Sequence, residues 1–135
     1  ILVVDFGTAT TICALSKDKV YLGGAIMPGF RLSMSALSNE AAKLMQVDIV
    51  VPEQAMGKTT ASQLQSGLFY SQLGGVKALL SEISDSHFPD ELPVMIATGG
   101  YAHLLDHTGL FDANVPDLVF HGLRLIWQKM GKSSS

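Results

Sequence analysis

The chain has 135 residues, of which 47% are hydrophobic and 16% are charged. This composition excludes a disordered protein, and the length predicts one domain with its own core. The net charge is −3 and the basic residues are not clustered, so we expect no nucleic acid partner. The single cysteine excludes an internal disulfide and favours a cytoplasmic location. No apolar run approaches the roughly 20 residues of a membrane span, so we expect no membrane partner.

The chain opens inside an apolar run, residues 1–4, and its first residue is Ile rather than Met. We therefore expect a piece of a longer protein, namely its C-terminal half. Within this piece we expect a single domain over residues 1–131, followed by a polar tail over residues 132–135.

Three short segments at the start of the chain are typical of strands, because they are apolar or rich in β-branched residues. The segments are residues 1–4, 9–15 and 20–27, the last interrupted by Gly23-Gly24. The connections between them are long enough only for hairpin turns. The sequence thus predicts an antiparallel meander that ends at Pro28-Gly29.

Apolar residues at spacings of three and four predict helices in the rest of the chain. The predicted elements are a helix from Phe30 to Leu44, an extended stretch over 47–51, a helix over 59–84, a strand over 94–97, a helix that starts at 98–100 and a helix over 117–130. Gly74-Gly75 weakens the prediction of the second helix. This order describes an α/β fold with a mixed sheet and helices on both faces, which is the pattern of the ribonuclease-H-like fold.

The first candidate site is the turn Asp5-Phe6-Gly7-Thr8. Backbone N–H groups and threonine hydroxyls in such a turn can line a phosphate, and glycine lets the backbone approach it closely. The Asp5 carboxylate cannot face a phosphate without a cation, so it would hold a metal ion. The alternative is an ordinary hairpin turn, in which Asp and Gly take their usual turn roles.

The second candidate site is Thr98-Gly99-Gly100, where a buried strand runs into a helix. The N–H groups at the start of that helix could face an anion or a flat base. The alternative is a tight connection between strand and helix that binds nothing.

The third candidate is Gly57-Lys58-Thr59-Thr60, which invites comparison with a P-loop. That comparison fails, because the earlier glycine of the motif is absent and no strand leads directly into the stretch. The alternative is a helix start that is capped by Thr59 or Thr60.

Histidine and cysteine offer weaker signals. His103 and His107 are four residues apart and could share one helical face as metal ligands, but no further ligand accompanies them. A solvent-exposed or capping pair is the better interpretation. Cys13 lies within a strand and has no adjacent base, which argues against a role as nucleophile.

Taken together, these motifs resemble the C-terminal half of type III pantothenate kinases, which belong to the actin-like ATPase superfamily together with acetate and sugar kinases. Six stretches carry the resemblance in order along nearly the whole chain: DFGTATT at 5–11, GGAIMPG at 23–29, GKTT at 57–60, QSG at 65–67, ATGG at 97–100 and LVFHGL at 118–123.

The resemblance implies an enzyme that phosphorylates pantothenate to 4′-phosphopantothenate with ATP and Mg²⁺, the first step of coenzyme A biosynthesis. It assigns ATP contacts to Gly7, Thr8, Gly99 and Gly100. Asp5 would bind a monovalent cation, K⁺ or NH₄⁺, and Thr60 would contact pantothenate. Family members are homodimers with the active site near the subunit interface.

The chain also departs from the family pattern. The family's first phosphate loop and its Gly-x-Asp-Arg stretch, whose aspartate is the general base, are absent, and no Asp-Arg dipeptide occurs here. We therefore expect no catalytic residue in this chain, and the N-terminal half of the same enzyme as its partner. The chain alone should be inactive.

Two other functions remain open. The first is a non-catalytic, nucleotide-binding regulatory protein of the same fold, which a complete chain without Gly-x-Asp-Arg would favour. The second is another phosphotransferase of the superfamily, which would need a larger substrate domain than these short loops provide.

Overall fold

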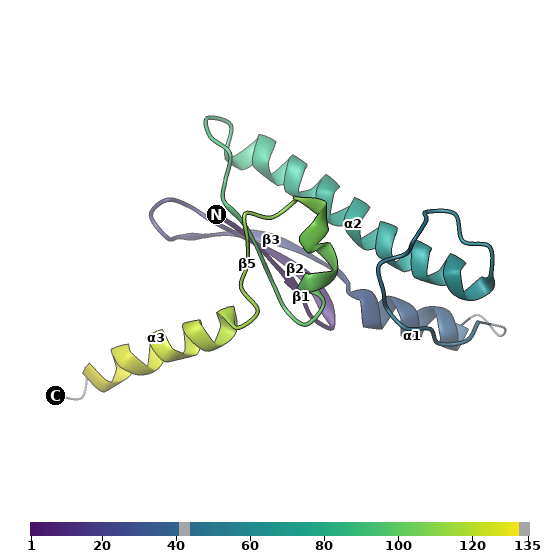
Figure 1. Ribbon diagram of the computed structural model, residues 1–135. Helices are drawn as coiled ribbons and strands as arrows, with labels where there is room; N and C mark the ends of the chain where they lie inside the picture. Colours follow the sequence, from purple (N-terminus) through teal and green to yellow (C-terminus); the bar gives the residue numbers. More distant parts are fainter. Residues whose placement is uncertain (41–43, 133–135) are drawn as a thin grey trace.

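The computed structural model describes residues 1–40 and 44–132 (Figure 1). Its elements, in chain order, are β1 (Leu2–Phe6), β2 (Ala9–Leu15), β3 (Tyr21–Pro28), α1 (Phe30–Glu40), α2 (Thr60–His87), β4 (Met95–Thr98), the 3₁₀ helix η1 (Ala102–Thr108), β5 (Ala113–Asn114) and α3 (Leu118–Lys132). The strands form one sheet in the order β3-β2-β1-β4-β5.

The sheet is mixed, as the sequence predicts. β1 pairs antiparallel with β2, and β2 with β3, so the meander is confirmed. β4 then pairs parallel with β1, and β5 parallel with β4. The sequence did not predict β5, because a strand of two residues is too short to show a periodic pattern.

β3 continues through Gly23-Gly24, where we expected an interruption. Gly23 has φ = +127°, a backbone conformation that side chains disfavour. A Cβ on Gly24 would lie 1.7 Å from the carbonyl oxygen of Ile12. The two glycines therefore permit the close approach of β3 to β2, next to a register irregularity at Ala14/Leu15.

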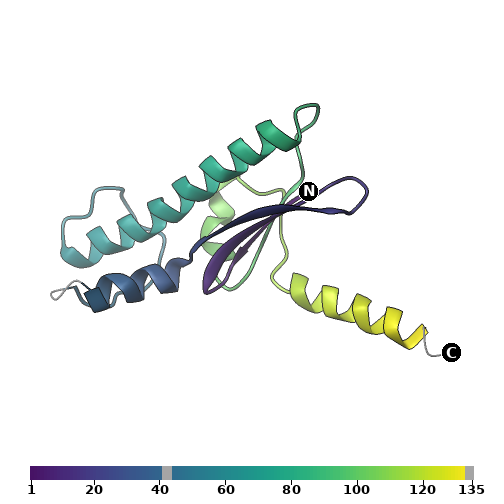
Figure 2. The same ribbon diagram turned by 180° about the vertical axis from the view of Figure 1, so that it is seen from behind.

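The hydrophobic core lies on one face of the sheet. Leu2, Val4 and Phe6 of β1 alternate with half-buried residues and are completely buried, together with Phe30 of α1. α1, α2 and η1 cover this face (Figures 1 and 2), and side chains of η1 belong to the same core cluster. Burial of each such side chain stabilises the fold by about 1.5–3 kcal/mol.

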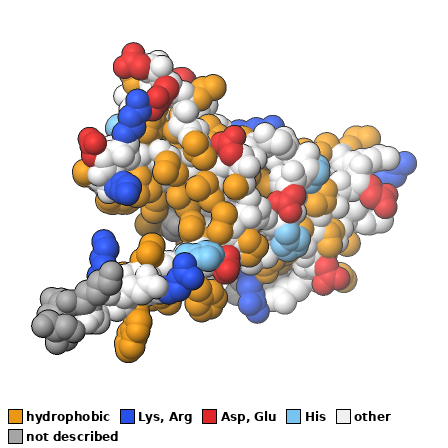
Figure 3. All heavy atoms as spheres, turned by 60° about the vertical axis from the view of Figure 1, so that its left-hand side comes forward, with side chains coloured by type: hydrophobic (Ala, Val, Ile, Leu, Met, Phe, Trp, Pro, Cys, Tyr) orange, Lys and Arg blue, Asp and Glu red, His pale blue; other side chains and the backbone are white. Residues whose placement is uncertain are grey.

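The expectation of helices on both faces is wrong for the described residues. α3 extends away from the sheet instead of covering its second face (Figures 2 and 3). Its Phe120 and Trp127 are 72% and 79% exposed. The apolar periodicity of residues 117–130 predicts a helix with an apolar side, but it does not say which surface that side contacts.

Other elements differ from the prediction in detail. α2 runs through Gly74-Gly75, and a Cβ on Gly75 would lie 2.9 Å from the Met27 methyl carbon, so the missing side chain lets the helix pack against β3. Residues 47–51 form no strand. Ala41, in the first predicted helix, and residues 133–135 of the tail lie outside the described residues, whereas Lys132 ends α3.

Within residues 1–40 and 44–132, no helix has the length and hydrophobicity needed to cross a bilayer.

Candidate functional site

Two candidate sites from the sequence meet at the carboxyl ends of the parallel strands β1 and β4. Asp5 and Thr98 are partners in the register of these strands. The Gly7-Thr8 turn follows β1, and Gly99-Gly100 follows β4. In α/β sheets, ligands bind outside the carboxyl ends of parallel strands.

The Asp5 carboxylate lies between these two glycine turns. A Cβ on Gly99 would be 2.4 Å from Asp5 Oδ1, and a Cβ on Gly7 would be 3.6 Å from it. Asp5 is half-buried, yet among the described residues its carboxylate has no hydrogen bond and no ion pair. The carboxylate is therefore free to take a ligand at the ends of the two strands.

The Gly7-Thr8 turn is held in place by backbone packing. The Gly7 N–H donates to the Ala9 carbonyl at 3.1 Å, which closes the turn. A Cβ on Gly29 would lie 2.5 Å from the Thr8 carbonyl oxygen and 2.7 Å from that of Gly7. Thr8 is exposed, and within the described part of the chain its hydroxyl forms no hydrogen bond. The turn thus presents a free hydroxyl on a fixed backbone.

The backbone conformation and the close neighbours of position 99 require a glycine there. Its φ is +92°, and a Cβ there would also lie 2.7 Å from the Phe6 carbonyl carbon. The Tyr101 N–H donates to the Phe6 carbonyl at 3.2 Å, which ties this turn to the end of β1. Gly100 is exposed, with open space where a Cβ would be. The helix expected from 98–100 is the short 3₁₀ helix η1, so any anion contact here would come from the turn rather than from a helix dipole.

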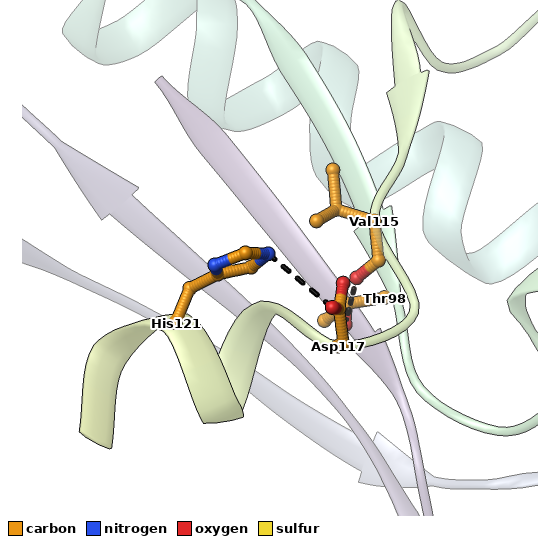
Figure 4. A network of polar contacts seen from close by, with 4 residues as sticks. All are labelled: Thr98, Val115, Asp117 and His121. Atoms are coloured by element: carbon orange, nitrogen blue, oxygen red, sulfur yellow. Dashed lines mark hydrogen bonds and ion pairs between the residues drawn. The ribbon is translucent and has the colours of Figure 1, made fainter. Parts of the chain in front are cut away.

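Two separate polar contacts lie between this site and the first turns of α3 (Figure 4). Thr98 Oγ1 donates to the Val115 carbonyl at 2.7 Å. Asp117 Oδ2 lies 3.3 Å from His121 Nε2, a pair spaced at i,i+4. The sequence motifs give no role to Asp117 and His121, although an Asp and a His four residues apart at a helix start indicate such a pair.

Thr60 lies elsewhere, as the first residue of α2. The N-cap is Thr59: its Oγ1 accepts from the Ser62 N–H at 3.2 Å, and its own N–H donates to Ser62 Oγ at 3.0 Å. Thr59, and not Thr60, therefore caps the helix, which is the alternative that the sequence left open. The Thr60 side chain is exposed, and no hydrogen bond of its hydroxyl occurs among the described residues.

The structure does not bring Thr60 to the Asp5 turns, because the N-terminal end of α2 lies beside α1 and away from the sheet (Figures 1 and 2). A cavity of about 520 Å³ does open near this end. Gly57 and Lys58 border it, but Thr60 does not.

The geometry of the histidine pair does not favour a metal site. η1 is a 3₁₀ helix with three residues per turn, so residues four apart do not share a face. The His107 ring stacks on Phe69, and His103 Nδ1 lies 3.0 Å from the Gly100 carbonyl oxygen. Within the described residues, no group of three His, Cys, Asp or Glu side chains could hold a metal ion. Cys13 is half-buried in β2.

The family model and the curated relatives point to the same family. A family model described as type III pantothenate kinase matches residues 1–82. The chain is 57% identical over 128 residues to type III pantothenate kinase 1 of Francisella tularensis subsp. holarctica, which covers 95% of this chain and 50% of that protein. It is 50% identical over 125 residues to the type III pantothenate kinase of Legionella pneumophila, covering 93% and 49%. The chain thus spans about half the length of the curated relatives it matches.

Among solved structures, the chain is similar to a Campylobacter jejuni protein described as a Baf family transcriptional activator. The TM-score is 0.67 at 24% identity, over 97% of this chain and 58% of that one. At this identity the similarity supports the fold alone.

Proposed function

The chain belongs to the type III pantothenate kinase family, and from that premise we propose that it forms one half of an enzyme that phosphorylates pantothenate with ATP. The product would be 4′-phosphopantothenate, in the first step of coenzyme A biosynthesis. The observation that carries this proposal is the half-buried Asp5 carboxylate, which lies between two glycine turns at the carboxyl ends of β1 and β4 and has no partner among residues 1–40 and 44–132.

We further propose that the mixed sheet is a ribonuclease-H-like, actin-like ATPase domain over residues 1–131. Its partner would be the N-terminal half of the same cytoplasmic enzyme. The exposed apolar side chains of α3 support a partner, because large apolar residues gathered on one helix are typical of a surface that another unit covers. The general base would come from that half.

In this site the protein would act mainly by positioning. The backbones of Gly7, Gly99 and Gly100 and the Thr8 hydroxyl would hold the ATP phosphates, and Mg²⁺ would arrive with the nucleotide. The γ-phosphoryl group would move in line: its bond to the ADP oxygen breaks as a bond to the pantothenate hydroxyl oxygen forms. The hydroxyl proton would pass to the aspartate outside this chain.

Asp5 fits a monovalent cation better than a protein-held divalent one. Mg²⁺ and Ca²⁺ sites gather several oxygen ligands, whereas Asp5 is a single carboxylate with no acidic cluster among the described residues. K⁺ or NH₄⁺ bound here would supply positive charge between the carboxylate and the phosphates. The Asp5 side chain would fix that ion at the end of β1.

Thr60 would contact pantothenate. Its hydroxyl has no hydrogen bond in the described part of the chain, which supports this role, since the capping hydrogen bonds use Thr59 instead. Its distance from the Asp5 turns within one chain supports the homodimer that the family implies, because a second copy could bring its own α2 to the site.

The regulatory alternative differs in one respect that can be tested. A nucleotide-binding regulator would bind ATP at the Asp5 turns without consuming it. The test uses the complete protein with ATP, Mg²⁺, K⁺ and pantothenate, and it follows ADP release with and without pantothenate. Pantothenate-dependent ADP release supports the kinase, whereas ATP binding without turnover supports the regulator.

A further inference from the structure

α2 carries a buried amide where its pattern calls for an apolar residue. Gln72 is only 2% exposed. It lies four residues from Leu68 and four from Val76, and both of these are buried in the core. A buried amide without hydrogen bonds is costly, so a glutamine on this stripe must be satisfied by specific partners.

Both ends of the Gln72 amide have such partners. Thr10 Oγ1 donates to Gln72 Oε1 at 2.8 Å. Gln72 Nε2 donates to the Pro28 carbonyl oxygen at 2.5 Å. The orientation of the amide follows from chemistry, because a carbonyl oxygen only accepts and must therefore face the NH₂ group.

These two partners adjoin the Gly7-Thr8 turn. Thr10 pairs with Phe6 in the last rung between β1 and β2. Pro28 pairs with Ala9 in the last rung between β2 and β3. Gly29, the next residue, packs its backbone against the turn itself. Gln72 thus holds the strand ends on both sides of the turn.

We propose that Gln72 is a positioning residue for the Gly7-Thr8 turn, and through it for the ATP phosphates. This inference rests on the proposed function, which places the phosphates at that turn. Gln72 touches no substrate; it fixes β2 and the end of β3 relative to α2, so that the free Thr8 hydroxyl and the Gly7 backbone keep one geometry.

The test uses the complete kinase and the variant Gln72→Met, which keeps the length of the side chain but removes both hydrogen bonds. We expect the KM for ATP to rise about twofold to tenfold, the effect of losing hydrogen bonds of ordinary strength. The KM for pantothenate should stay unchanged. Ser71→Ala is the matched control, because Ser71 is exposed on the same helix and its hydroxyl, among the described residues, donates only to the Leu68 carbonyl of that helix.

A second variant separates positioning from stability. Gln72→Met combined with Thr10→Val removes the Thr10 hydroxyl together with the amide that it bonded, and only the Pro28 carbonyl loses its donor, so the melting temperature should return part of the way to that of the wild type. The KM for ATP should remain raised. If the KM for ATP recovers together with the melting temperature, Gln72 is only structural and the inference is wrong. This double variant also carries the test if Gln72→Met fails to fold.

Thr8→Ala distinguishes the inference from its premise. If Thr8→Ala raises the KM for ATP while Gln72→Met does not, the kinase assignment stands and the role of Gln72 falls. If neither substitution changes the KM for ATP, the phosphates do not lie at this turn, and the placement of ATP and the role of Gln72 both fail.

Discussion

Asp5→Asn in the complete kinase removes one negative charge from the site and keeps the shape of the side chain. Two unit charges about 4 Å apart interact by roughly 4 kcal/mol at an effective dielectric of 20. Attraction of this size would hold a cation at Asp5, and repulsion of the same size would act between Asp5 and a phosphate if no cation lay between them.

The expected net effect is smaller than 4 kcal/mol, because Asp5 is only half-buried and the substitution also relieves its repulsion of the phosphates. A remaining loss of about 1–2 kcal/mol changes an equilibrium constant about 5- to 30-fold. We therefore expect the K⁺ concentration at half-maximal activation to rise by about this factor, and the ATP requirement to rise with it.

The assay is ADP release at fixed pantothenate, with K⁺ titrated at several ATP concentrations. Asp90→Asn is the control, since it removes the same charge from an exposed loop residue far along the chain. An Asp5→Asn enzyme with the K⁺ activation curve of the wild type would refute the cation site and the electrostatic argument behind it.

Four further predictions concern the rest of the chain. Thr60→Ala in the complete kinase should raise the KM for pantothenate several-fold without lowering the melting temperature. Thr59→Ala should instead cost about 0.5–2 kcal/mol of stability, because it removes the N-cap of α2. If Thr60→Ala lowers the melting temperature and leaves the KM for pantothenate unchanged, Thr60 has only a structural role. Gly99→Ala should destabilise the fold by about 1–3 kcal/mol or more in denaturant unfolding, since it forces a side chain into φ = +92° and against Asp5. Residues 1–135 alone should release no ADP from ATP, Mg²⁺, K⁺ and pantothenate. Turnover like that of a complete kinase would contradict the inference that this chain lacks the general base.

The sequence predicted those parts of the fold that local chemistry decides. Short turns at Gly7 and after Leu15 permit only hairpins, so the meander of β1, β2 and β3 was predictable. The apolar period of α2 was strong enough to outweigh two glycines. The meeting of Asp5 with Gly99 was not predictable from spacing, because it depends on the parallel pairing of β1 with β4.

Other features could not be predicted from the sequence, for physical reasons. A polar residue in a helical pattern is normally assigned to the solvent side, so Gln72 gave no sign that it lies in the core. The Thr59-Thr60 pair offers two equivalent hydroxyls, and only backbone geometry distinguishes the cap from its neighbour. The apolar side of α3 predicts a helix but does not specify which surface covers that side, so the position of α3 away from the sheet was not predictable.

The parallel pairing of β1 with β4 also has a consequence for how the chain folds. Leu2 and Met95, which form one rung of this pair, are separated by about 90 residues of intervening chain. Contacts between such distant segments form slowly, because the entropy of closing a long loop is lost before the pairing compensates for it. The hairpins can assemble early, but Asp5 meets Gly99 only when β4 has joined the sheet. With the nucleotide at these turns, as proposed, recovery of nucleotide binding during refolding would report closure of this long loop, and a bound nucleotide would favour the closed chain by mass action.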